Sequence, residues 1–225
     1  MNEVIFLGED LDLINEFNSL KDKESVSWSD EKYSHVRQII KNHYLKEQDY
    51  TCFFCRQRMV VNSNRAWDAE HIISKSTHPG FMFEPKNLCI TCPDCNNEKR
   101  DGRVLDRESR VRFPKNSTAY KIVHPHFDSY DDHLEVIVVG KLYRIKTPKG
   151  RYTYRIYGLD RFMMDAGLCR EEKGSDKVQK LMQSALMDSK NYEVYEEKVL
   201  EELLLKHSKK IGSDTTLDAI RNLRQ

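Results

Sequence analysis

The sequence predicts an α+β protein built around a strand, a loop, a second strand and a short helix that share one metal site. Three observations predict this class. Five of the six cysteines fall within residues 50–104, two segments of that stretch have the composition of short strands, and apolar residues at helical spacing occur on both sides of it. The expected divisions are an N-terminal helical segment (1–49), a core (50–115) and a C-terminal region of antiparallel sheet plus helices (116–225).

Charge and hydropathy narrow the class of protein. The 37 basic and 36 acidic residues nearly cancel, so any attraction to nucleic acid must come from a local patch. The chain contains no apolar run of about 18 residues and begins with nothing that resembles a secretion signal. We therefore expect no membrane association and a cytoplasmic location.

Two amphipathic helices are expected before the core. In the first, Leu13, Ile14, Phe17 and Leu20 fall at helical spacing. The second is expected to begin at Ser29, a residue type that caps helices, and acidic residues follow in its first turn. Its apolar face would consist of Tyr33, Val36, Ile39, Ile40 and Tyr44. The sequence predicts that this helix packs on the core and supports it.

Two Cys-x-x-Cys pairs, Cys52/Cys55 and Cys92/Cys95, have the spacing of a four-sulfur zinc site. Such a site is closed, so the zinc would stabilise the fold while any chemistry happens elsewhere. Disulfides fit poorly, because cytosolic cysteines stay reduced. Cys89 also stands three residues before Cys92, but on a strand it would point to the opposite face, which favours a core position. Cys169 has no partner nearby in the sequence and is interpreted in the same way.

The stretch from residue 67 to residue 102 predicts four elements. These are a strand over 67–73, a polar loop over 74–85, a strand over 87–91 and a short helix near Asn96 that ends by Gly102. Three features of it match a known pattern: Glu70-His71-Ile72, Asn87-Leu88, and Cys92-Pro-Asp-Cys95-Asn96-Asn-Glu-Lys99. With these residues the chain resembles the HNH endonucleases, which have a ββα-metal active site. The resemblance covers about 55 residues.

The resemblance implies that His71 is the general base, that Glu70 and Asn96 hold a catalytic divalent ion, and that Asn87 braces the loop carrying His71. Glu at position 70 and Asn at position 96 depart from the commoner residues of the family, which bears on metal preference. The implied cofactors are structural Zn²⁺ and catalytic Mg²⁺ or Mn²⁺.

Independently of this resemblance, the residue types suit the hydrolysis of a phosphodiester bond. An unperturbed imidazole can act as a base near neutral pH, and carboxylate and amide oxygens suit magnesium or manganese. Asn96 is expected at the start of the helix, where Lys99 and Arg100 one turn later would hold phosphate. Glu70 and His71 would need a bend or a bulge at the end of the strand to face one site together. The competing readings are a core histidine, an Asn that only caps the helix, and a solvated lysine.

Three further segments each allow two interpretations of their role. His78 lies in the loop and either touches substrate or is a surface residue. Residues 103–115 are rich in arginine, which fits either a phosphate-binding stripe or a solvated charged helix face. Residues 120–133 are rich in His and Asp, and a structural turn is favoured over a second metal site because the spacing matches no ligand rule.

The C-terminal region is expected to contain three antiparallel strands, 134–139, 141–146 and 151–157, and then helices with apolar stripes over 181–186 and 194–204. These stripes suit core packing, and they would also suit docking of a partner or a second copy. The order of these segments resembles, more weakly, HNH subunits of bacterial antiphage systems such as Septu, which implies a defence role with an ATPase partner.

The sequence therefore predicts a metal-dependent endonuclease, with DNA favoured over RNA as its substrate. The alternative is a non-catalytic zinc module that binds nucleic acid or protein, for which the four cysteines alone would suffice. A pure scaffold subunit is the third class. Only the first class needs Glu70, His71 and Asn96.

Overall fold

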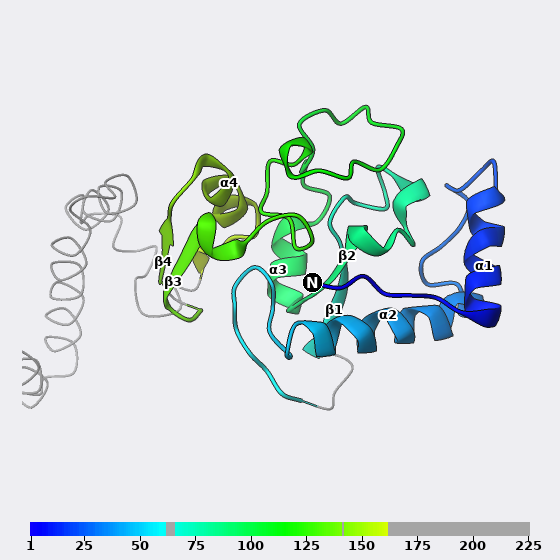
Figure 1. Cartoon of the computed structure of the whole chain (residues 1–225), viewed down its shortest axis with the longest axis horizontal. Helices are drawn as coiled ribbons and strands as arrows, with labels where there is room; N and C mark the ends of the chain where they lie inside the picture. Colours follow the sequence, from blue (N-terminus) through cyan, green and yellow to red (C-terminus); the bar gives the residue numbers. More distant parts are fainter. Residues whose placement is uncertain (62–65, 141, 162–225) are drawn as a thin grey trace, which may run out of the picture. The chain divides into compact units, whose positions relative to one another are not determined.

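The computed structural model describes residues 1–61, 66–140 and 142–161. Met1–Ala166 form one compact unit, and the expected boundaries at residues 49 and 115 both fall inside it. The helices and strands, coloured along the chain in Figure 1, are α1 (Gly8–Ser19), α2 (Ser34–Glu47), β1 (Asp68–His71), β2 (Leu88–Thr91), α3 (Pro93–Lys99), β3 (Leu134–Val138), β4 (Leu142–Ile145) and α4 (Pro148–Ile156). The architecture is thus mixed helix with two small antiparallel sheets.

The two N-terminal helices form where the apolar spacing predicts them. Helix α1 buries Ile14 and Phe17, and α2 buries Val36, Ile40 and Tyr44, which are four residues apart and therefore share one face. The start of the second helix differs from the expectation. Asp30, and not Ser29, supplies the cap by accepting from the Lys32 N–H, and a 3-10 turn over Glu31–Tyr33 precedes α2.

Strands β1 and β2 pair antiparallel, with Asp68 opposite Thr91 and His71 opposite Leu88, and α3 follows directly and packs against β1. The pairing register is continuous, so the expected bulge between Glu70 and His71 does not occur. The expectation that Asn96 begins the helix is also wrong. Helix α3 begins at Pro93 with Cys92 as its cap, and the Asn96 N–H already donates to the Cys92 carbonyl.

The third expected strand, 151–157, is a helix. Thr147 caps α4 by accepting from the Gly150 N–H, and Pro148 occupies the first turn, where its missing N–H costs nothing. Gly150, in the first turn of α4, allows a close approach of the backbone. A Cβ at Gly150 would lie 2.1 Å from the His133 carbonyl oxygen. The antiparallel meander is therefore a two-stranded hairpin, β3 and β4, followed by a helix.

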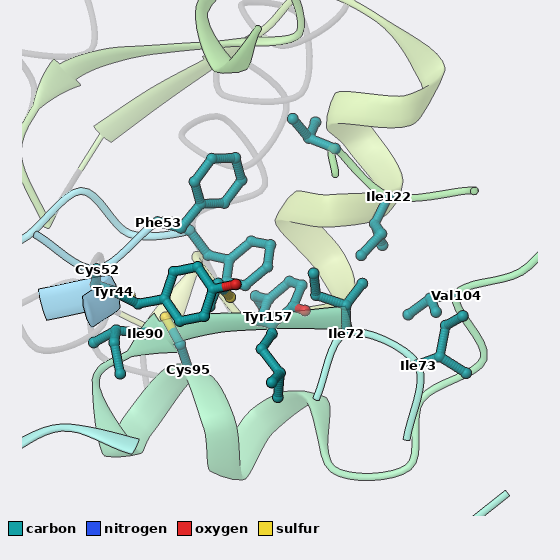
Figure 2. Close-up of a cluster of buried hydrophobic side chains, with 14 of the residues drawn as sticks. Tyr44, Cys52, Phe53, Ile72, Ile73, Ile90, Cys95, Val104, Ile122 and Tyr157 are labelled. Carbon is teal, nitrogen blue, oxygen red and sulfur yellow. The ribbon is translucent and has the colours of Figure 1, made fainter. Parts of the chain in front are cut away.

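One hydrophobic core joins the N-terminal helices, the segment around α4 and the unit formed by β1, β2 and α3, which we call the ββα unit. Figure 2 shows Phe53 from the first cysteine loop, Ile72 from the end of β1 and Tyr157 from the end of α4 in this cluster. The Phe54 and Tyr157 rings stack with centroids 3.4 Å apart and planes 13° apart. The ββα unit is therefore buried against the residues that follow it, as well as against α2.

No helix within the described ranges is long and apolar enough to cross a membrane. Cys169 and the apolar stripes over 181–186 and 194–204 lie outside the described residues.

Candidate active site and zinc centre

The four cysteines of the two Cys-x-x-Cys pairs converge on one point. Their sulfur atoms all lie within 4.8 Å of one another, and the Cys55 and Cys92 sulfurs are 3.7 Å apart. Tetrahedral zinc with bonds of about 2.3 Å holds its sulfurs about 3.8 Å apart, whereas a disulfide would need about 2 Å. The four side chains therefore fit a zinc ion, and among the described residues no other group of His, Cys, Asp or Glu has this arrangement.

Segments far along the chain hold this cluster in place. The Tyr143 hydroxyl donates to the Cys55 carbonyl at 2.6 Å, and the Tyr130 hydroxyl donates to the Phe54 carbonyl at 2.8 Å. The Arg161 guanidinium lies 3.1 Å from the Cys95 sulfur. Because four thiolates and one Zn²⁺ carry two net negative charges, this cation offsets part of the charge.

Cys89 is fully buried and is not a member of the group, as the strand alternation predicted. Burial raises the pKa of its thiol well above the ordinary value, so Cys89 is a neutral core residue.

A polar cavity of about 360 Å³ lies beside the zinc cluster, between β1 and α3. Most of the residues proposed for the active site line it, namely Glu70, His71, Asn96, Lys99 and Arg100. The cavity also has lining residues that the sequence did not single out, namely Trp28, Asp68, Ala69, Ser74, Lys75, Asn97 and Asp101. Its carboxylates (Asp68, Glu70, Asp101) equal its cations (Lys75, Lys99, Arg100) in number, so a bound phosphate would need further positive charge.

His71, the last residue of β1, is held as a neutral base. Its Nε2 lies 3.0 Å from the Met82 carbonyl oxygen, and Trp28 meets its ring edge to face at 4.5 Å. Burial lowers the pKa of the imidazole to about 3, and the charges of Lys75 and Lys99 act in the same direction, so the ring is neutral near pH 7. Because a carbonyl can only accept, Nε2 of the neutral ring carries the hydrogen and Nδ1 keeps its lone pair.

Glu70 points to the other side of the strand, toward α3 and α4. Its carboxylate lies 2.8 Å from the Lys99 ammonium, and the Tyr157 hydroxyl donates to it at 3.3 Å. Lys99 also donates to the His71 carbonyl. Burial raises the pKa of Glu70, and Lys99 and Tyr157 offset this only in part. Lys99 thus neutralises Glu70 inside the protein, which differs from the expected solvent-facing role in holding phosphate.

Asn96 contacts Asp68 through a hydrogen bond of 2.9 Å, in which the Asn96 Nδ2 donates to the Asp68 carboxylate. This bond uses only the Nδ2 of Asn96. The Oδ1 is therefore the atom of Asn96 that would bind a cation. Asp68 is a site residue that the sequence reasoning missed. The signal was present in the strand, because residues two apart share one face and Asp68 precedes Glu70 by two.

Asn87 fastens the loop that follows His71. Its Oδ1 accepts from the Ile73 N–H at 2.7 Å, and its Nδ2 donates to the Ile73 and Phe81 carbonyls, each at 3.0 Å. The side chain is fully buried. Asn87 does not line the cavity, so it positions the backbone that carries His71 and has no contact with a reacting group.

Asp101 and two serines form a hydrogen-bonded group at the cavity. Asp101 accepts from the Ser74 hydroxyl at 2.5 Å and from the Ser76 hydroxyl at 2.7 Å, and these bonds lower the pKa of Asp101. They place Lys75 between the two serines at the cavity wall. Nothing in the sequence spacing indicates a contact between residues 27 positions apart.

The remaining candidates lie away from the cavity. His78 stacks on Phe81 and contacts the Glu108 carbonyl. The arginine-rich segment 103–115 contains no helix, and Arg110 pairs with Asp106. In the segment 120–133, Asp128 accepts from the His124 N–H and from Lys149, which is the structural turn favoured from the sequence.

No family model, curated protein or solved structure matches the chain.

Proposed function

We propose that the chain is a metal-dependent endonuclease that hydrolyses phosphodiester bonds in the cavity between β1 and α3. The observation that carries the proposal is the setting of His71. A neutral imidazole with Nε2–H bound to a carbonyl, and with Nδ1 unprotonated, lines the same cavity as carboxylate and amide oxygens.

The residues divide the work as follows. The His71 Nδ1 takes the proton of the attacking water, and the Met82 carbonyl keeps the ring in the required tautomer. Burial of the ring and the charges of Lys75 and Lys99 keep it neutral at physiological pH, and Trp28 packs against it. Arg100 and Lys75, which line the cavity, are the cations that would bind the phosphate oxygens.

The oxygen donors fit Mg²⁺ or Mn²⁺, which when bound would supply positive charge to the phosphate and the leaving oxygen. Asp68 and the Asn96 Oδ1 lie together in the cavity, which makes Asp68 a ligand candidate alongside Glu70 and Asn96. Glu70 would have to exchange the Lys99 ammonium for the ion. Its pairing with Lys99 satisfies the carboxylate when no ion is present.

The zinc-loaded protein should be incubated with supercoiled plasmid and, separately, with total tRNA, in the presence of magnesium, manganese or a chelator. We expect metal-dependent cleavage that falls at least 100-fold in His71→Ala, because a general base contributes about 10²- to 10⁴-fold. His35→Ala is the matched control, since His35 is exposed and pairs with Asp10 on α1. Equal cleavage by wild type and His71→Ala would refute the assignment of the base.

The weaker resemblance to antiphage HNH subunits adds the proposal of a defence role with an ATPase partner. Cleavage that requires a co-expressed ATPase would support it. Binding of nucleic acid without cleavage under any of these conditions would favour the non-catalytic zinc module.

A further inference from the structure

A second groove adjoins the cavity and has no part in the chemistry described above. Its volume is about 430 Å³, and it shares Trp28, Asp68 and Ala69 with the cavity that contains His71. Its other lining residues are Ser34, Arg37, Gln38, Lys41, Asn42 and Trp67. We call it the α2 groove. Because three residues line both spaces, the two spaces are neighbours.

One side of the α2 groove is a polar stripe of helix α2. Arg37, Gln38, Lys41 and Asn42 stand one, three and four residues apart, so they lie on one face, next to the apolar face that packs on the core. The stripe contributes two cationic and two amide side chains to the groove. The groove has one carboxylate, that of Asp68, so its lining carries a net positive charge. Burial lowers the pKa of Lys41, and the negative charge of Asp68 acts in the opposite direction, so an anion near this ammonium stabilises its charged form.

The α2 groove also has aromatic lining residues. Both tryptophans of the chain line the α2 groove. Trp28 is partly exposed and touches His71, and Arg37 fixes the loop that carries Trp28 by donating to the Trp28 and Asp30 carbonyls, each at 2.7 Å. Trp67 is buried, and its indole N–H has no acceptor among the residues that the structure describes.

Cations, side-chain amides and an indole face in one groove are the chemistry that binds unpaired nucleotides. A base inside a duplex has both faces covered by its neighbours, so it cannot lie on Trp28. We propose that the α2 groove binds an unpaired nucleotide of the substrate strand next to the phosphate that is cut, with its base on Trp28 and its phosphate at Lys41. This inference rests on the proposed nuclease function and adds that the substrate is single-stranded, or locally unpaired, at the cut.

Binding is tested with the zinc-loaded full chain and no added magnesium or manganese, so that cleavage plays no part. Labelled 12-mers of oligothymidine and oligouridine, and a 12-base-pair duplex, are titrated by fluorescence anisotropy at several salt concentrations. We expect the single strands to bind at least 5-fold more tightly than the duplex. The DNA and RNA arms show which sugar the groove prefers.

Two variants and one control locate the site. Lys41→Gln should weaken single-strand binding several-fold and reduce the salt slope by about 0.7, the value for one phosphate contact on a single strand. Lys46→Gln makes the same change in charge on α2 outside the groove, and should leave both unchanged. Trp28→Leu should weaken binding about 5-fold or more. Because both tryptophans line the groove, single strands should also quench the intrinsic fluorescence, and less so in Trp28→Leu.

The outcomes separate the groove from the nuclease. If the wild type cleaves nucleic acid but Lys41→Gln binds like Lys46→Gln, the groove proposal is wrong and the nuclease stands. If binding depends on Lys41 and Trp28 but no condition gives cleavage, the groove binds single strands and the catalytic proposal fails. Binding of the duplex as tightly as the single strands overturns the groove. Circular dichroism and zinc content check that each variant is folded.

Discussion

The zinc cluster and the cavity beside it use the same helix in different ways. Cys92 and Cys95, three residues apart at the start of α3, turn to the other two sulfurs, and the cluster is closed and buried. Asn96, Lys99 and Arg100, also three and four apart, turn to the cavity, which is open and polar.

The two regions also differ in how their charges are balanced. The four sulfurs lie within 4.8 Å of one another, and as thiolates they would repel one another unless a metal cation bound them. In the cavity, every acidic side chain already has a partner: Asp68 has Asn96, Glu70 has Lys99, and Asp101 has two serines. From this comparison we expect the four-cysteine site to need a metal ion for stability, and we expect the cavity to keep its shape without one because its acidic groups are already paired.

Loss of the zinc should have the largest effect. Cys95→Ser should reduce zinc content from one ion per chain to none and abolish the cooperative thermal transition, because structural zinc contributes on the order of 10 kcal/mol to small domains. Metal analysis and thermal melting measure both quantities. Cys89→Ala is the control, since Cys89 is a buried thiol outside the cluster and should retain the zinc. A Cys95→Ser protein that melts cooperatively without metal would show that the core does not need the ion.

Breaking the buried ion pair should have the next largest effect. Lys99→Met leaves the Glu70 carboxylate without its cation inside the protein, which should cost about 3–5 kcal/mol in urea unfolding of the zinc-loaded protein. Glu70→Gln combined with Lys99→Met removes both charges and should recover much of this loss. Additive losses in the double variant would mean that the two groups do not interact.

Substitution of Asn87 tests whether its hydrogen bonds hold the loop that follows His71 in place. Asn87→Asp keeps the acceptor for the Ile73 N–H but replaces the donor to the Ile73 and Phe81 carbonyls with an oxygen, so we expect a loss of about 2–4 kcal/mol. Activity should fall with it, because the loop after His71 shifts. Asn18→Asp on α1 is a matched change at an exposed position that does not line the cavity. Equal stability of the two variants would exclude the proposed brace.

The pH dependence should be the smallest effect near neutrality. The folded pKa of His71, about 3, lies below the unfolded value of about 6.5, so the unfolded state binds more protons between these limits. Stability from this group is therefore complete above pH 6.5 and falls as the pH drops toward 3, by about 0.7 kcal/mol from pH 7 to pH 6. Urea unfolding at several pH values, compared with His71→Gln, isolates the contribution. Nitrogen NMR should find the Nε2–H tautomer at both pH 8 and pH 5.

The sequence alone determined the features that depend on spacing along the chain. The two Cys-x-x-Cys pairs predicted a four-sulfur group, and strand alternation separated Cys89 from it. Apolar periodicity placed α1 and α2, and residue type drew attention to His71, Asn87 and Asn96. The helices and the face of Cys89 follow from a regular repeat of 3.6 or 2 residues, and the cysteine pairs are recognised by their local Cys-x-x-Cys spacing.

The tertiary structure decided which groups meet across long separations. Only the fold brings Lys99 and Tyr157 to Glu70, Asp101 to Ser74, and Trp28 to His71. It also made a helix of 148–156, because the Thr147 cap and the close approach at Gly150 favour that conformation over strand-forming side chains. Which group pairs with a buried charge depends on the side chains that the fold packs around that charge. That choice depends on burial of the whole chain, which no short stretch of sequence encodes.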